Sequence, residues 1–281
     1  MLKRAFDAAL AISPAAKRAM IGLLYRILSR VDRDADMVFM NYGFAVPGTN
    51  GGGLALRDED EADRYCIQLY HHLAGEIELV GKDVLEVGSG RGGGASYIAR
   101  YLGPRSYVGV DRCAAAVEFC ARHHAVPRLA FRAGDAEALP FPDASFDVVL
   151  NVESSHGYGS MERFLGEVRR VLRPRGHFLY TDHRGPHQLD EWRAQIRGSG
   201  LDVLRETEIT PNVLEALDRD DDRKRRLIEQ KCPRWFRDSF HEFAAMKGSA
   251  AYARFRTGRT RYLSFVLRKP DGGAGDGTAS G

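Results

Sequence analysis

Residues 83–92, Asp-Val-Leu-Glu-Val-Gly-Ser-Gly-Arg-Gly, contain the turn that decides the fold. The apolar run 84–87 predicts a buried strand, the glycines predict a tight turn, and residues 95–102 predict a helix. Glycines at such a turn let the backbone approach a ligand without interference from a Cβ atom. Glu86 stands two residues before the first glycine. A carboxylate there suits a ligand that carries an ammonium or sulfonium group better than it suits a bare pyrophosphate.

The turn also satisfies a looser nucleotide-binding pattern. Gly88, Gly90 and Gly93 form G-x-G-x-x-G, which on its own is a weak signal shared with dinucleotide-binding enzymes. Residues 106–110 predict a second strand, and Asp111 follows it directly. An acid at that position accepts hydrogen bonds from ribose hydroxyls. NAD and S-adenosylmethionine (SAM) both fit these features.

Three further segments separate the two cofactors. They are FRAGDAEALPFP at 131–142, SFDVVLN at 145–151 and VLRPRGHFLY at 171–180. In this order and spacing they resemble the class I SAM-dependent methyltransferases, and the resemblance is strong over residues 83–184. It implies a Rossmann-like fold, methyl-transfer activity and SAM as cofactor.

The resemblance also implies a set of cofactor-binding residues. In this family the acid before the glycines and the loop around Gly88 and Gly90 hold the methionine part. The acid matching Asp111 takes the ribose, and the one matching Asp135 lies by the adenine amino group. The expected cofactor site is Glu86, Gly88, Ser89, Gly90, Asp111, Arg112, Asp135, Ala136 and Asn151.

The whole chain predicts an α/β fold, a doubly wound, mainly parallel sheet of seven strands. Five strands alternate with helices over 83–184, and a helix at 188–198 and strands at 203–209 and 262–267 follow. We expect an N-terminal helical lid at 1–80, a SAM-binding core at 81–269 with a helical insertion at 211–258, and a disordered tail at 270–281. The tail is mostly Gly, Ala, Ser, Thr and Asp and can bury little apolar surface.

Composition excludes several classes of protein. The formal net charge of +3 over 281 residues is too small to indicate nucleic-acid binding. The four cysteines show no metal-binding spacing, and no metal site is expected. No apolar run is long enough to span a membrane. We therefore expect a cytoplasmic enzyme with reduced thiols and without membrane insertion.

Candidate catalytic residues follow the fourth and fifth strands, because ligands of open α/β sheets bind beyond the carboxyl ends of the strands. His156 is placed to accept a hydroxyl proton during methyl transfer, or else it only lines the pocket. Asp182 would orient His156, bind substrate or cap the next helix. Glu153 is expected to shape the SAM pocket rather than to do chemistry.

The N-terminal region supplies two more candidates. Ser13-Pro14 predicts the start of a basic amphipathic helix that packs on the core or on a second subunit, giving a homo-oligomer, rather than on a membrane. The segment 39–44, FMNYGF, resembles the N-x-G-Y/F segment that folds over SAM in the small-molecule branch of these enzymes. Tyr42 would contact the sulfonium or the substrate by a cation–π attraction, or simply pack. The glycines at 51–53 are a candidate lid hinge.

The acceptor is expected to be a hydrophobic small molecule, such as a polyketide or terpenoid secondary metabolite. The sequence is similar to methyltransferases of the phthiotriolone type, which act on hydroxyls of polyketide lipids, and to the teleocidin-type C-methyltransferases of actinobacteria. Transfer to a hydroxyl oxygen and transfer to an alkene carbon, with carbocation-driven cyclisation, both stay open. A non-catalytic nucleoside-binding protein and an NAD-dependent oxidoreductase are the alternatives from other classes.

Overall fold

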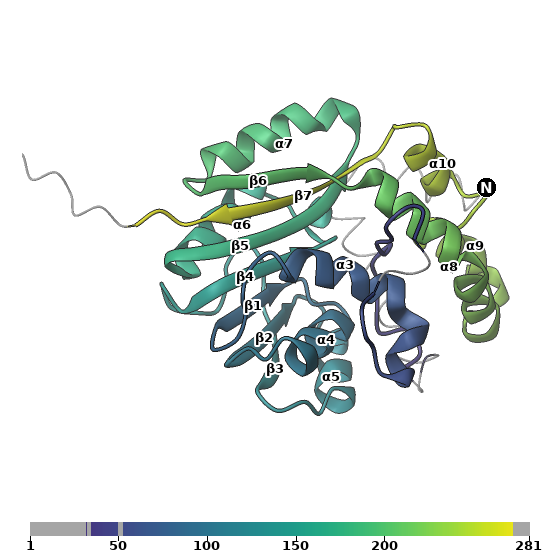
Figure 1. The fold of residues 1–281 in the computed structure, drawn as a ribbon, viewed down its shortest axis with the longest axis horizontal. Coiled ribbons are helices and arrows are strands. Elements are labelled where there is room, and N and C mark those ends of the chain that lie inside the picture. Colours follow the sequence, from purple (N-terminus) through teal and green to yellow (C-terminus); the bar gives the residue numbers. More distant parts are fainter. Residues whose placement is uncertain (1–31, 33–34, 50–52, 272–281) are drawn as a thin grey trace, which may run out of the picture.

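The computed structural model describes residue 32 and residues 35–49 and 53–271, whose strands form one seven-stranded sheet in the order β3-β2-β1-β4-β5-β7-β6 (Figure 1). The first five strands pair in parallel, and β7 is antiparallel to both β5 and β6. The expected doubly wound, mainly parallel sheet of seven strands is confirmed. The strands are β1 (Asp83–Val87), β2 (Ser106–Asp111), β3 (Leu129–Ala133), β4 (Phe146–Val152), β5 (Leu172–Arg184), β6 (Asp202–Glu208) and β7 (Arg261–Arg268).

Helices cover both faces of the sheet, because alternate strand residues point to opposite sides. Val84 belongs to one apolar core, which it shares with helices α3 (Arg64–Ala74), α4 (Gly93–Tyr101), α8 (Thr210–Lys231) and α10 (Ala250–Arg256). Leu85 belongs to the other, with α6 (Met161–Val171) and α7 (Pro186–Gly198). Helix α5 (Ala114–His123) packs beside β2 and β3. A third, small core joins α8 to α9 (Arg237–Phe243). Short 3-10 turns lie at η1 (Asp58–Asp63), η2 (Ser155–Gly157) and η3 (Arg234–Phe236).

The helix after the glycine turn begins earlier than the sequence predicts. It starts at Gly93 rather than at residue 95. A Cβ atom on Gly94 would lie 2.0 Å from the Tyr70 ring, so this glycine serves close packing of α4 on α3. Glycine in a helix looks like a loop residue in the sequence, and here the packing overrides that preference.

Residues 35–49 and 53–57 contain no helix or strand, although a helical N-terminal region was expected. We refer to residues 35–45 as the strap. Gly43 has φ +92°, a conformation that no helix accommodates. The buried guanidinium of Arg91 donates to the Asp32 carboxylate at 2.6 Å and to the Met37 carbonyl at 2.7 Å. These bonds hold the strap against the glycine turn. The predicted helix at 14–31, Gly51, Gly52 and residues 272–281 lie outside the described residues.

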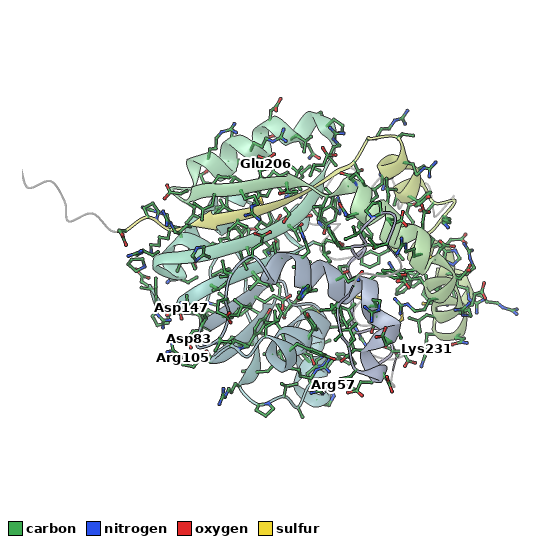
Figure 2. The ribbon with its side chains drawn as sticks, viewed as in Figure 1. Arg57, Asp83, Arg105, Asp147, Glu206 and Lys231 are labelled. Carbon is green, nitrogen blue, oxygen red and sulfur yellow. The ribbon has the colours of Figure 1, made fainter. Side chains whose placement is uncertain are left out.

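An ion-pair network lies at the amino ends of β1 and β4, at the end of the sheet opposite the glycine turn (Figure 2). Asp83 and Asp147 share Arg105, and Arg173 Nη1 lies 3.0 Å from Asp83 and 2.8 Å from Asp147. Both carboxylates are therefore neutralised by arginines that stabilise this end of the sheet. Ligands of open α/β sheets bind at the other end, beyond the carboxyl ends of the strands. Within the described part of the chain, no helix has the length and apolar character needed to cross a bilayer.

Candidate active site

A cavity of about 580 Å³ opens at the carboxyl ends of the parallel strands. Its wall is built from the strap, the turn after β1 and the segments that follow β2, β3 and β4. The structure thus brings together residues that are far apart in the chain. Of the site residues predicted from sequence, Tyr42, Gly88, Ser89, Gly90, Asp111, Arg112, Asp135, Ala136 and His156 line this cavity.

The glycine turn forms one end of the cavity. Gly88 and Gly90 have φ angles of +80° and +54°. A Cβ atom on Gly88 would come within 2.3 Å of Ser154 Oγ, so the turn tolerates no side chain there. Ser89 Oγ is buried and has no hydrogen-bond partner in the described structure. A turn in which Gly88 and Gly90 lack Cβ atoms and the Ser89 hydroxyl is unsatisfied fits a polar ligand such as the amino-acid part of SAM.

Two acids, Asp111 and Asp135, line the cavity at the ends of β2 and β3. Asp111 accepts the backbone N–H groups of Gly90, at 2.9 Å, and Cys113, at 2.8 Å. Burial raises the pKa of Asp111 above its ordinary value, and these bonds oppose the rise. Asp135 accepts the N–H of Glu137 at 3.0 Å. Both side chains are thereby fixed at the cavity wall, as hydrogen bonding to ribose and adenine would require.

Glu86 lies behind the wall rather than in it. Its fully buried carboxylate accepts hydrogen bonds from the hydroxyls of Tyr70, at 2.7 Å, and Tyr107, at 2.9 Å, and it is not among the lining residues. Burial raises the pKa of Glu86 to about 7, although the two phenols oppose this. Tyr70 does line the cavity. Glu86 therefore contacts the cavity wall through the Tyr70 hydroxyl.

Asn151 occupies a similar supporting position. Its Nδ2 donates to the Val87 carbonyl at 2.8 Å and to the hydroxyls of Ser154 and Tyr158 at 2.7 and 2.9 Å. Asn151 is fully buried and absent from the lining, whereas Ser154 and Tyr158 are part of it. The amide thus ties the end of β1 to the loop after β4.

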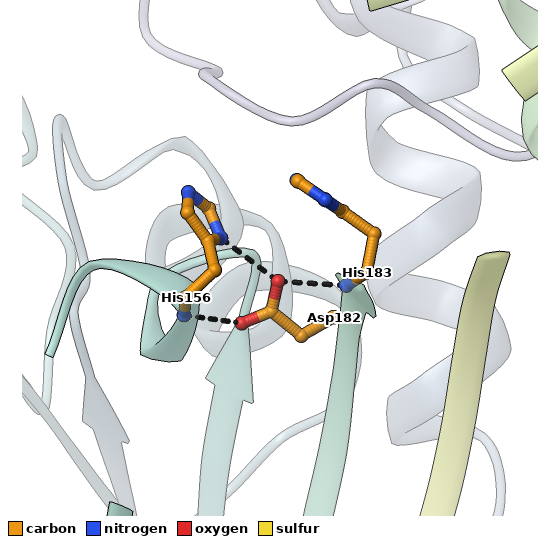
Figure 3. Close-up of side chains that lie close together, drawn as sticks. All are labelled: His156, Asp182 and His183. Carbon is orange, nitrogen blue, oxygen red and sulfur yellow. Dashed lines mark hydrogen bonds and ion pairs between the residues drawn. The ribbon is translucent and has the colours of Figure 1, made fainter. Parts of the chain in front are cut away.

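His156 and Asp182 form a hydrogen-bonded pair beside the cavity (Figure 3). His156 Nδ1 lies 2.8 Å from Asp182 Oδ1, and the backbone N–H of His156 donates to Oδ2 at 2.9 Å. A proton on Nδ1 shared with a carboxylate leaves Nε2 as the accepting nitrogen of the neutral ring. His156 lines the cavity, whereas Asp182 is buried below it. This arrangement can orient the imidazole as a general base.

Asp182 itself is saturated with partners. It also accepts the Ser155 hydroxyl at 2.6 Å and the His183 N–H at 2.8 Å, and Arg184 lies 3.3 Å away. Burial alone would raise the pKa of Asp182, but His156 and Arg184 hold it well below its usual range. His156, Asp182 and His183 are close enough to hold a metal ion together. The adjacent guanidinium and the occupied carboxylate oxygens favour proton handling over metal binding.

Tyr42 meets the core at Glu153, which directly follows β4. The backbone N–H of Tyr42 donates to Glu153 Oε1 at 2.8 Å, and the Tyr262 hydroxyl donates to the same oxygen at 2.7 Å. Glu153 has a left-handed φ of +47°. Burial raises its pKa to about 8, against the effect of both hydrogen bonds. The Tyr42 ring packs against His183 and Phe255, with centroids 5.5 and 5.3 Å apart. These contacts hold the strap beside the His156–Asp182 pair.

Three features that shape the cavity and the His156–Asp182 pair were not predicted from the sequence. They are the Arg91–Asp32 ion pair, Tyr70 and the role of Arg184. Arg91 lies inside the glycine motif, and an arginine at that position was the one sign in the sequence that a buried ion pair could form there. Its partner is 59 residues away and carries no local signature.

Comparison with known proteins identifies the family. A family model described as a methyltransferase domain matches residues 85–180. A fatty-acid O-methyltransferase of Mycolicibacterium smegmatis is 41% identical over 248 residues, 88% of this chain and 89% of that protein. A phthiotriol/phenolphthiotriol dimycocerosates methyltransferase of Mycobacterium tuberculosis is 38% identical over 245 residues, 87% of this chain and 90% of that protein.

Solved structures share the fold at low sequence identity. The [4+2]-cyclase SpnF superposes with a TM-score of 0.66 at 19% identity, over 90% of this chain and 96% of its own. The geranyl diphosphate C-methyltransferase of Streptomyces coelicolor gives a TM-score of 0.61 at 16% identity, over 82% and 92% of the two chains.

The fold and the cavity define a Rossmann-like enzyme with a glycine turn at the carboxyl end of β1. The chain belongs to the SAM-dependent methyltransferases. Its methyl donor is SAM, which decides between the two cofactors that the glycine turn alone left open.

Proposed function

We propose that this enzyme methylates a hydroxyl oxygen of a lipid-like molecule, with His156 as the general base and Asp182 as the residue that orients it. The 2.8 Å contact between His156 Nδ1 and Asp182 Oδ1 carries this proposal. The oriented imidazole would accept the hydroxyl proton at Nε2 as the oxygen attacks, and Asp182 would stabilise the resulting imidazolium.

The cofactor residues are proposed on the same footing. SAM supplies an electrophilic methyl group on a sulfonium. Gly88, Ser89 and Gly90 would cradle its methionine part, with Asp111 at the ribose and Asp135 at the adenine. Arg112 and Ala136 line the same wall, whereas Glu86 and Asn151 would act from behind it.

Tyr42 would cover the methyl-transfer site from the strap. Its backbone bond to Glu153 fixes the strap, and its ring stands against His183. An aromatic face there attracts positive charge and excludes water. The expected assembly of homo-oligomers through residues 14–31, the cytoplasmic location and the division into lid and core stay predictions from sequence.

The acceptor class is inferred from the relatives. The most informative are a fatty-acid O-methyltransferase and phthiotriol/phenolphthiotriol dimycocerosates methyltransferases, whose names point to lipid acceptors. The first relative makes a carboxyl oxygen a second candidate acceptor. A fatty-acid carboxylate is already ionised at neutral pH and needs no base. Dependence on His156 therefore separates the two.

Product analysis tests the acceptor directly. The enzyme is incubated with methyl-labelled SAM and matched lipids that carry a hydroxyl, a carboxyl or an isolated alkene. We expect the label in a methyl ether. Label in a methyl ester would favour the carboxyl alternative, and label on carbon would contradict O-methylation altogether.

A further inference from the structure

A second, smaller cavity of about 60 Å³ lies between the strap and helices α8 and α9. It is separated from the SAM cavity by a single layer of side chains, since Phe39, Met40, Asn41, Tyr42 and Phe243 line both. It therefore adjoins the larger cavity across the strap and Phe243. A group that extends from His156 past Tyr42 would reach it.

One wall of this second cavity is apolar. Met37 and Met40 come from the strap region, Leu227 and Ile228 from α8, and Phe240 from α9. Unbranched methionine side chains adapt to ligands of irregular shape, so the strap wall can widen. This wall has the lining expected for a hydrocarbon group.

The other wall is charged, but its charges are matched. Arg223 contacts Asp63 at 3.0 Å and Asp220 at 2.6 Å, and Lys224 lies 3.6 Å from Asp220. Lys224 Nζ also donates to the Tyr42 carbonyl at 3.3 Å. These groups hold α8 to the strap and to η1 and offer no single unmatched charge for an ionic ligand.

We propose that the second cavity is a subsite for the hydrocarbon tail of the acceptor, and that Leu227 and Phe243 set the tail length the enzyme accepts. This rests on the proposed function, because it places the reacting hydroxyl at His156. Met40 and Phe243, which separate the cavities, would move aside as the tail enters. Leu227 lines the second cavity without lining the first, so it reports on the tail alone.

The test replaces Leu227 by the larger Trp. The matched control is Arg226→Trp, because Arg226 is the exposed neighbour on the same helix and lines neither cavity. Binding of hexanol and of dodecanol is measured calorimetrically in the presence of S-adenosylhomocysteine, so no methyl transfer is needed. We expect Leu227→Trp to weaken dodecanol binding about tenfold and to leave hexanol within about twofold. Arg226→Trp should change neither.

Equal loss for both alcohols, no loss for either, or the same loss in Arg226→Trp would overturn the subsite. S-adenosylhomocysteine affinity reports folding. If Leu227→Trp loses that affinity, the milder Leu227→Phe takes its place, and the subsite is tested by the same comparison of dodecanol with hexanol binding. A failure of the His156 proposal would appear in turnover or in the product, and the chain-length dependence of binding would stand apart from it.

Discussion

Asp182 holds His156 at two points, through Nδ1 of the ring at 2.8 Å and through the backbone N–H at 2.9 Å. Both contacts come from one fully buried carboxylate at the end of β5. The imidazole is thus fixed in position and in tautomer before any substrate arrives. If His156 acts as the proposed base, it would need no reorganisation when the acceptor binds.

Replacing Asp182 by Asn should slow turnover about 10²–10⁴-fold, because the amide no longer stabilises an imidazolium and permits the wrong tautomer. The matched control is Asp190→Asn, whose side chain is fully exposed. Steady-state kinetics should show the loss in kcat, with S-adenosylhomocysteine affinity within about threefold of the parent. Equal kcat in the two variants would rule out an orienting role.

Breaking the buried pair between Arg91 and Asp32 should destabilise the fold by about 3–5 kcal/mol in Asp32→Ala, since a buried guanidinium loses its counterion. Both side chains are completely buried. The control is Glu118→Ala, which removes an exposed pair with Arg122 and should cost less than about 1 kcal/mol. Urea unfolding measures both. A cost for Asp32→Ala as small as the control's would mean that this pair does not anchor the strap.

Gly94→Ala should destabilise the protein by about 1–3 kcal/mol and weaken SAM binding, because the new methyl group displaces the Tyr70 ring that lines the cavity. Gly166→Ala is the matched change in α6, where a Cβ atom meets nothing within 4 Å. That control should stabilise the protein by up to about 1 kcal/mol. Thermal unfolding and calorimetric titration with SAM check the pair, and the same response from both glycines would refute the packing argument.

The buried acid Glu86 should make the fold less stable as the pH rises. Its pKa is raised from 4.5 unfolded to about 7 folded, so the folded state binds more protons between these values. The contribution of Glu86 to stability is then full below about pH 4.5 and declines by about 2–3 kcal/mol as the pH rises to about 7. Glu86→Gln should remove the part of the decline that Glu86 contributes and leave the part due to Glu153, whose pKa burial also raises, whereas the exposed control Glu162→Gln should keep the full decline. Urea unfolding across the window measures the slope, and a parallel slope in Glu86→Gln would contradict the assignment.

The sequence was sufficient for the sheet and for the strand ends that carry the predicted lining residues, because those features depend on local patterns. Gly88 and Gly90 follow a strand directly, and Asp111 and Asp135 stand at strand ends whose position is set by hydrophobic runs. The segment 39–44 was predicted to fold over the site, but the conformation of the strap was not, since it depends on partners such as Glu153, which is 111 residues from Tyr42.

The sequence also could not show whether a single polar side chain lines the cavity or lies behind its wall. Glu86 and Asn151 flank the glycine turn and looked like ligand contacts, yet the structure puts both behind the wall. Burial of a polar side chain is set by partners that arrive from other elements, here Tyr70 and Tyr107 for Glu86 and Tyr158 for Asn151. A strand pattern alone does not show those partners.

The most direct test of the account is the single-turnover rate of His156→Ala, measured with labelled SAM and the hydroxylated acceptor that product analysis identifies. The exposed His187→Ala is the matched control. The account predicts a rate about 10²–10⁴-fold below that of the control, with S-adenosylhomocysteine binding unchanged within about twofold. A His156→Ala rate within about threefold of the control would contradict general-base catalysis by His156.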